Sequence, residues 1–265
     1  MESQIHLPYE PEAEPVSDAA TASRRGYWWA SRTATYGFLA ALPLFLLYEA
    51  LILWVNPTGP SQVRVGADLW IKQLLALFGG TGLFALGIPV LLIGIWIFVR
   101  DRKNRPPLKM KWFGWIVGES IIYAVLVALL VSTVVGLIFA MVPAGSPGLS
   151  ADALPTSMML VLSIGAGLYE ELVFRVVLVG GMFWAFRQVV SRPWIAYVVA
   201  ALIGAFLFSA VHYVGALGDV FTLPSFTFRF LFGLALNGVF LARGFGVAAW
   251  THALYDVLVV TQILG

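Results

Sequence analysis

The number of apolar stretches long enough to cross a lipid bilayer constrains this chain more than any other feature. A spanning helix needs about 20 consecutive, mostly apolar residues. Six or seven stretches meet this requirement, at about residues 34–55, 75–98, 113–142, 155–186, 194–214, 226–242 and 245–264. An amphipathic lead-in at about residues 67–72 precedes the second stretch, and as a separate interfacial helix it brings the number of elements to eight.

The composition agrees with a membrane solvent. Of the 265 residues, 60% are hydrophobic and 11% are charged, whereas soluble domains carry about 25% charged residues. The mean hydropathy is +0.88, and a water-soluble fold of this length could not bury so much apolar surface. Ten tryptophans fit a chain with many membrane interfaces. We therefore predict an all-α, multi-pass transmembrane helix bundle of about seven spans.

The positions of the basic residues test this number of spans, because short cytoplasmic loops carry an excess of Lys and Arg. Twelve basic residues precede the first span or separate spans two and three, four and five, or six and seven: Arg24, Arg25, Arg32, Arg100, Arg102, Lys103, Arg105, Lys109, Lys111, Arg187, Arg192 and Arg243. The opposite loops hold only Arg64, Lys72 and Arg229. The alternation predicts a cytoplasmic N-terminus and a C-terminus outside.

Residues 1–26 are predicted to be a disordered cytoplasmic tail, because they are rich in acidic residues and proline and lack the basic and apolar regions of a signal peptide. Residues 27–265 are predicted to form one membrane-embedded helical domain of a prokaryotic plasma (inner) membrane protein. The chain has no cysteine, which excludes disulfides and a thiol nucleophile. No basic patch lies outside the membrane-flanking loops, so we expect no nucleic-acid partner.

Six ionisable residues lie inside the predicted spans of the second half of the chain. A charged side chain at bilayer depth costs at least about 2.5–3.5 kcal/mol, so such a residue is a functional candidate by default. The six are Glu170, Glu171 and Arg175 in the fourth span, His212 in the fifth, and His252 and Asp256 in the seventh. Glu49 and Glu119 are isolated cases in the first half.

The spacing of these residues predicts specific contacts. Glu171 and Arg175 are four residues apart with the acid first, the favourable order for a helical ion pair. Glu170 is offset from Glu171 by about 100° around an α-helix, so it points elsewhere. His252 and Asp256 share one helix face. A Glu–Arg pair can simply hold helices together and a membrane histidine can be an interhelical hydrogen-bonding group, but six such residues in three helices are hard to attribute to packing alone.

The residue types suit hydrolysis of an amide inside the membrane. A carboxylate with a nearby imidazole activates water as a general base, and a second histidine can donate a hydrogen bond to an oxyanion. The zinc signature H-E-x-x-H and the serine elbow G-x-S-x-G are both absent. The one Gly-Asp dipeptide, Gly218-Asp219, lies in a predicted loop. The neighbouring aromatic residues Tyr169, Phe174, Phe208 and Trp250 are interpreted as packing residues or cavity walls.

Three segments together resemble a known family. They are E-E-L-V-F-R at residues 170–175, F-S-A-V-H at residues 208–212 and H-A-L-Y-D at residues 252–256. In this order they resemble the CAAX-protease and bacteriocin-processing (CPBP, or ABI) family of intramembrane glutamic endopeptidases, whose pattern is E-E-x-x-x-R, F-x-x-x-H and H-x-x-x-(N/D). The resemblance covers about residues 160–264, with the candidate catalytic motifs in residues 156–264.

The resemblance implies a role for each matched position. Glu170 looks like the catalytic glutamate, which activates water together with His212. Glu171 and Arg175 look like a supporting pair, and His252 with Asp256 looks like the oxyanion side. An asparagine at the last position could donate to an oxyanion, whereas Asp256 can do so only when protonated, so here it orients or charges His252. The implied enzyme hydrolyses a peptide bond of a membrane-associated protein or peptide and needs no cofactor and no metal.

Three alternatives stay open from the residues alone. The chain could be a non-catalytic membrane protein of the same fold, such as an immunity factor or scaffold. It could be a proton-coupled transporter in which Glu170, His212 and His252 form a protonatable path, although no inverted repeat is visible. Five of the six residues could instead hold Zn, Mn or Fe, namely Glu170, Glu171, His212, His252 and Asp256.

If the helices were straight and parallel, the three motifs would not all lie at the same depth in the membrane. At about 1.5 Å per residue, Glu170 lies about 25 Å from Arg187, whereas His252 lies only about 13 Å from Arg243. Convergence of the three motifs therefore requires tilted helices, or a segment at residues 243–246 that dips into the membrane. Glycines at positions 244 and 246 make irregular backbone plausible there.

Overall fold

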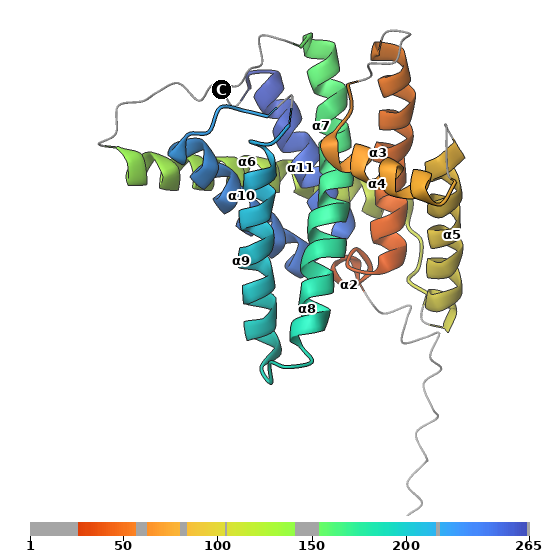
Figure 1. The fold of residues 1–265 in the computed structure, drawn as a ribbon. Coiled ribbons are helices and arrows are strands. Elements are labelled where there is room, and N and C mark those ends of the chain that lie inside the picture. The colour runs from red at the N-terminus through yellow and green to blue at the C-terminus, as the bar shows by residue number, and fades with distance from the viewer. Residues whose placement is uncertain are drawn as a thin grey trace, which may run out of the picture.

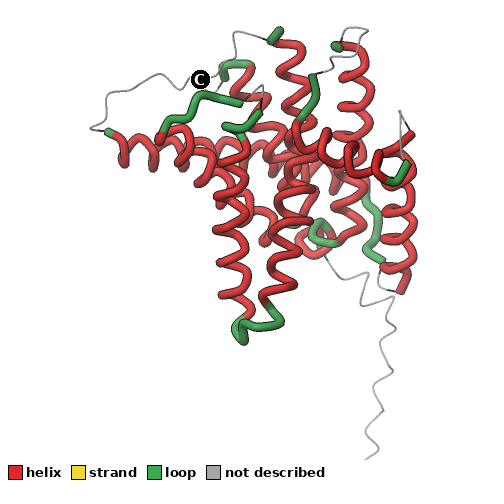
Figure 2. Tube along the Cα trace, in the orientation of Figure 1, coloured by secondary structure: helices red, strands yellow, loops and turns green. Residues whose placement is uncertain are grey.

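The computed structural model describes residues 26–56, 63–79, 84–103, 105–140, 154–215 and 218–263. Within these ranges the secondary structure is entirely helical, without a strand (Figure 2). The predicted all-α fold is therefore confirmed. The predicted disordered tail lies outside the described residues, apart from Gly26.

Four helices in the described part of the chain are long and apolar enough to cross a membrane: α3 (Ala34–Val55), α6 (Met110–Phe139), α9 (Pro193–Val211) and α10 (Leu223–Arg243). Only 22–39% of each apolar window is buried inside the protein. On α6, for example, Leu126, Leu129 and Leu130 are each more than half exposed. Apolar side chains that face outward over whole helices are suited to lipid, as expected of a multi-pass membrane protein.

The fourth predicted span is one continuous rod made of three helical segments. It consists of α7 (Thr156–Glu170), the π-helix η3 (Glu171–Val179) and α8 (Gly180–Phe186), in agreement with the predicted range 155–186. A π-helix pairs each residue with the fifth along the chain, so its turns are wider than those of an α-helix, and such turns are frequent at functional sites. The expected α-geometry after Glu170 was wrong in this respect.

The second predicted span is divided differently. Residues 75–77 belong to a separate helix, α4 (Gly66–Leu77), and the apolar helix α5 (Phe84–Arg100) begins later. One residue ends α4 before the apolar stretch begins. Gly79 adopts φ +81°, the left-handed conformation that stops a helix. Asp68 on α4 is buried and accepts a hydrogen bond from the Tyr48 hydroxyl of α3 at 3.0 Å, which holds this helix against the bundle.

The C-terminal helix α11 (Phe245–Val260) lies at the centre of the bundle, in contact with α3, α6, α7 and α10. Only Gly244, at φ +85°, separates it from α10. In Figure 1, α6 runs across the direction of α7 and α9, while α8 and the start of α9 project below the other helices. The α8–α9 end therefore extends farther than the α10–α11 corner, which accounts for the unequal distances of Glu170 and His252 from their nearest loops.

This packing corrects the interpretation of Arg243 and of two acidic residues in the first half of the chain. Arg243 is not a solvent-exposed loop residue, because its guanidinium pairs with Glu119 at 3.0 Å and its side chain is only 4% exposed. Glu119 and Glu49 are consequently not isolated. Glu49 pairs with Lys72 of α4 at 3.1 Å. The buried charges of the first half therefore join helices to one another.

Candidate active site

The structure brings all six predicted site residues together from three parts of the chain. Glu170 ends α7, and Glu171 and Arg175 lie on η3. His252 and Asp256 lie one turn apart on α11, and His212 follows the last residue of α9. The six divide into a buried group and a group that is partly open.

The buried group is centred on Glu171, whose side chain is fully buried. Its Oε1 atom lies 3.0 Å from Nη1 of Arg175 and 2.7 Å from Nδ1 of His252. The pair with Arg175 was predicted from the spacing. The contact with His252 was not, because the two residues are 81 positions apart and no local pattern connects them. Glu171 therefore forms an ion pair with a guanidinium and a hydrogen bond with an imidazole.

Small residues allow this contact between α7 and α11. A Cβ atom on Gly167 would lie 2.5 Å from the backbone nitrogen of Ala253 and 2.6 Å from the carbonyl oxygen of Ala249. Small residues at helix interfaces permit such close backbone approach in membrane proteins. Because Gly167 lies one turn before Glu171, the crossing places η3 within reach of His252.

The partly open group surrounds the carboxylate of Glu170. Its Oε2 atom lies 3.9 Å from Nε2 of His212 and 4.0 Å from Nε2 of His252. Asp256 Oδ2 lies 3.5 Å from the same His252 nitrogen. The side chains of Glu170, His212 and Asp256 are 16%, 26% and 27% exposed, whereas His252 is 4% exposed. The first two separations exceed a hydrogen bond and suit a water molecule between the partners.

The tautomer of His212 follows from its backbone contact. Nδ1 lies 2.7 Å from the carbonyl oxygen of Phe208. A carbonyl only accepts, so Nδ1 carries the proton, and in the neutral ring Nε2 is an acceptor that faces Glu170. In His252 the same logic applies to Nδ1, which donates to the carboxylate of Glu171. Both rings therefore turn Nε2 toward the partly open side of the site.

The predicted span 194–214 placed His212 inside a helix, and this was wrong. Helix α9 ends at Val211 and His212 is its C-terminal cap. The following loop turns back, and the Asp219 amide donates to the His212 carbonyl at 2.8 Å. Asp219 in turn pairs with Arg229 of α10, which also donates to the Tyr213 hydroxyl at 2.9 Å. This polar group beside the site was missed, because Arg229 was interpreted only as a boundary charge.

Aromatic rings form the apolar wall of the site. The Phe208 ring contacts the Arg175 guanidinium, with the cation 4.5 Å from the ring centroid. Its centroid lies 5.0 Å from that of His212 and 5.9 Å from that of His252. Phe232 contacts His252 from another side at 5.4 Å. The interpretation of Phe208 as a wall residue is confirmed, and its carbonyl additionally orients His212.

A second ionic cluster holds the residue next to Glu170. The Tyr169 hydroxyl donates to Glu49 Oε1 at 2.7 Å. Glu49 is also paired with Lys72, which pairs with the buried Asp68 at 2.8 Å. Tyr169 was interpreted as a packing residue, and its ring is buried. The hydroxyl contact adds a link from α3 and α4 to the end of α7.

The metal-site alternative receives no geometric support. Among the residues described, no group of three or more His, Asp or Glu side chains is arranged to hold a metal ion. The donor atoms around Glu170 Oε2 lie 3.9–4.0 Å from it.

Comparison with known proteins identifies the segment that carries the site. A family model described as type II CAAX prenyl endopeptidase, Rce1-like, matches residues 152–258. This range contains all six residues. Comparison with curated proteins and comparison with solved structures give no match.

Proposed function

Residues 152–258 form a domain of the Rce1-like type II CAAX prenyl endopeptidase family, and from this premise we propose that the chain is an intramembrane endopeptidase in which Glu170 and His212 activate the hydrolytic water. Family membership implies a protease and a protein substrate. We propose a membrane-associated protein or peptide as that substrate. The predicted spans are α3, α5, α6, the α7–η3–α8 rod, α9, α10 and α11.

The observation that carries the proposal is the placement of Glu170 between two imidazole nitrogens. Glu170 Oε2 and His212 Nε2 lie 3.9 Å apart, and a water molecule between them can donate one hydrogen bond to each. Its oxygen lone pair is then free to attack a peptide carbonyl. As the new C–O bond forms, the water proton passes to Glu170, which acts as the general base.

His252 is placed to stabilise the charge that develops on the carbonyl oxygen. With Nδ1 donating to Glu171, a protonated ring presents Nε2–H to the partly open side, where it can donate to an oxyanion. The carboxylates of Glu171 and Asp256 balance the positive charge of that ring. When the C–N bond breaks, the proton held by Glu170 passes to the leaving nitrogen. Each proton and each bond of the hydrolysis is accounted for by these residues.

The test is a comparison of membrane peptides in cells that produce the wild type, Glu170→Gln or His212→Ala. General-base catalysis contributes about 10²–10⁴-fold, so we expect cleavage products to fall by that factor in both variants. Glu12→Gln, in the predicted tail, is the charge-matched control and should cleave normally. Full cleavage by both site variants would contradict the proposed roles of Glu170 and His212. A cellular phenotype that persists in Glu170→Gln would favour the non-catalytic alternative.

A further inference from the structure

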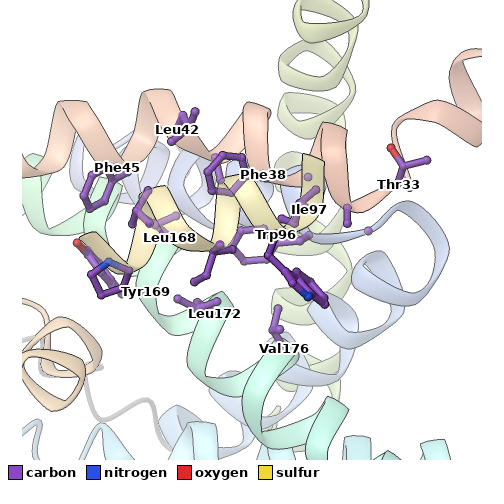
Figure 3. A pocket seen from close by; sticks show the side chains of 18 of the residues that line it. Thr33, Phe38, Leu42, Phe45, Trp96, Ile97, Leu168, Tyr169, Leu172 and Val176 are labelled. Carbon is purple, nitrogen blue, oxygen red and sulfur yellow. The ribbon is translucent and has the colours of Figure 1, made fainter. Parts of the chain in front are cut away.

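A large groove lies against the same rod as the candidate site but is lined by other residues. Its volume is about 750 Å³, within the usual range of about 300–1,000 Å³ for ligand pockets. Figure 3 shows its walls, with Phe38 and Phe45 on α3 toward Leu168 and Leu172 on the rod. Helix α5 supplies a third wall. Nearly all of the lining is aromatic or aliphatic, so the groove is suited to a hydrocarbon chain.

One end of the groove is basic. Arg32 and Arg100 both line it, together with Thr33, the N-cap of α3. These residues meet because α3 begins where α5 ends, and the Thr35 hydroxyl joins the two helix ends by donating to Asp101 at 2.5 Å. Within the described ranges, neither arginine forms an ion pair with an acid. The groove therefore combines an apolar channel with two guanidinium groups at its mouth, of which that of Arg100 lies 5.2 Å from the centroid of the Trp96 ring.

We propose that this groove binds an anionic phospholipid, with an acyl chain between α3, α5 and the rod and the phosphate at Arg32 and Arg100. Guanidinium groups bind phosphate oxygens through charge-assisted hydrogen bonds. The basic end lies on the predicted cytoplasmic side, where anionic headgroups attract Lys and Arg by about 1 kcal/mol per residue. A zwitterionic lipid could fill the same channel but would leave this charge uncompensated.

The bound chain contacts a neighbouring face of the segment that carries the site. Leu168, Leu172 and Val176 line the groove, whereas Glu171 and Arg175 of the same segment make the buried contacts of the candidate site. A chain packed between α5 and the rod therefore supports η3 through a face other than the one that contacts His252. Lipid binding itself requires no hydrolysis, so it is independent of the proposed function.

The test uses the purified full-length protein in detergent, with phosphatidylglycerol or phosphatidylcholine added, and reads bound lipid by native mass spectrometry. Two arginine contacts predict a preference for phosphatidylglycerol of about 10–30-fold. Arg32→Gln/Arg100→Gln should remove this preference. Arg102→Gln/Arg187→Gln, which changes the charge equally outside the groove, should retain it. Equal binding of both lipids by the wild type would overturn the proposal whatever the variants do.

A second pair of variants tests the channel. Val90 lines the groove on α5, so Val90→Trp should fill it and reduce phosphatidylglycerol binding at least about tenfold. Val99 is exposed on the same helix and does not line the groove, so Val99→Trp should bind normally. Retention of the lipid by a folded Val90→Trp protein would contradict the proposed site. A native mass spectrum that shows the wild-type chain bound to a second copy of itself, and to no lipid, would also contradict the proposed site.

Discussion

Nδ1 of His252 lies 2.7 Å from Oε1 of Glu171, and this contact joins α11 to η3 inside the bundle. The same oxygen forms an ion pair with Nη1 of Arg175 at 3.0 Å. One carboxylate thus neutralises a buried guanidinium and sets the orientation of an imidazole whose other nitrogen faces Glu170. Fold and candidate chemistry therefore share one residue.

Replacing Glu171 by Gln should reduce both the stability of the fold and the rate of substrate cleavage. Arg175 is left as an uncompensated buried charge, which costs about 3–5 kcal/mol of folding free energy. An amide can also donate to His252 and favour the wrong tautomer, so we expect cleavage to fall by up to about 10⁴-fold, as for a buried carboxylate behind a catalytic imidazole. Thermal unfolding in detergent and the peptide comparison would measure the two effects. Wild-type cleavage by Glu171→Gln would contradict the orienting role.

Gly167→Ala should loosen the crossing of α7 and α11. The added methyl meets the backbone of Ala249 and Ala253 at 2.5–2.6 Å, so the helices must separate. We expect a loss of about 1–3 kcal/mol in stability together with reduced cleavage. Gly181→Ala is the matched control on α8, because a Cβ there meets nothing within 4 Å. Equal behaviour of the two variants would show that the close approach is not required.

The Glu119–Arg243 pair should show strong coupling in a double-mutant cycle. Arg243→Met leaves Glu119 charged and nearly buried, which should cost about 3–5 kcal/mol. Glu119→Gln/Arg243→Met removes that charge, so the double variant should be more stable than Arg243→Met alone. We expect a coupling energy of about 1–3 kcal/mol from unfolding of the four proteins. Simple additivity would mean that the pair contributes nothing specific.

Tyr169→Phe should destabilise the protein more than Tyr197→Phe. Tyr169 donates to the carboxylate of Glu49, and Tyr197 donates to the carbonyl of Asn237 at 2.8 Å. Hydrogen bonds to charged groups contribute about 1.5–3 kcal/mol, against about 0.5–1.5 kcal/mol for neutral partners. Unfolding of the two variants under identical conditions compares these contributions. A larger loss in Tyr197→Phe would show that the Glu49 cluster does not depend on Tyr169.

The absence of cysteine permits a direct test of topology. Val214 is exposed just beyond the α9 cap and Arg187 is exposed at the opposite end of the α8–α9 pair. With the predicted cytoplasmic N-terminus, a membrane-impermeant maleimide applied to intact cells should label Val214→Cys and spare Arg187→Cys. Both should react after lysis, which controls for access. The reverse pattern would invert the predicted orientation and move His212 to the cytoplasmic side.

Local sequence patterns predicted the helix boundaries well where the length of an apolar stretch determines them. The predicted range 34–55 is that of α3, and the predicted range 155–186 is that of the α7–η3–α8 rod within one residue. The prediction failed where a single residue changes the backbone. Gly79 ends α4 in a left-handed conformation, and the wider π-turns begin at Glu171, a change that apolar periodicity does not show.

The sequence alone determined the helical fold class, because a chain with so many long apolar stretches has lipid as its solvent. It also predicted the six candidate site residues, because each is costly at bilayer depth and their spacing follows a family pattern. The spacing predicted the contact of Glu171 with Arg175, and only the tertiary structure decided the contacts between different helices. The contacts of Glu171 with His252, of Glu119 with Arg243 and of Tyr169 with Glu49 depend on helix crossings, and those crossings are decided by small residues and by packing between distant parts of the chain.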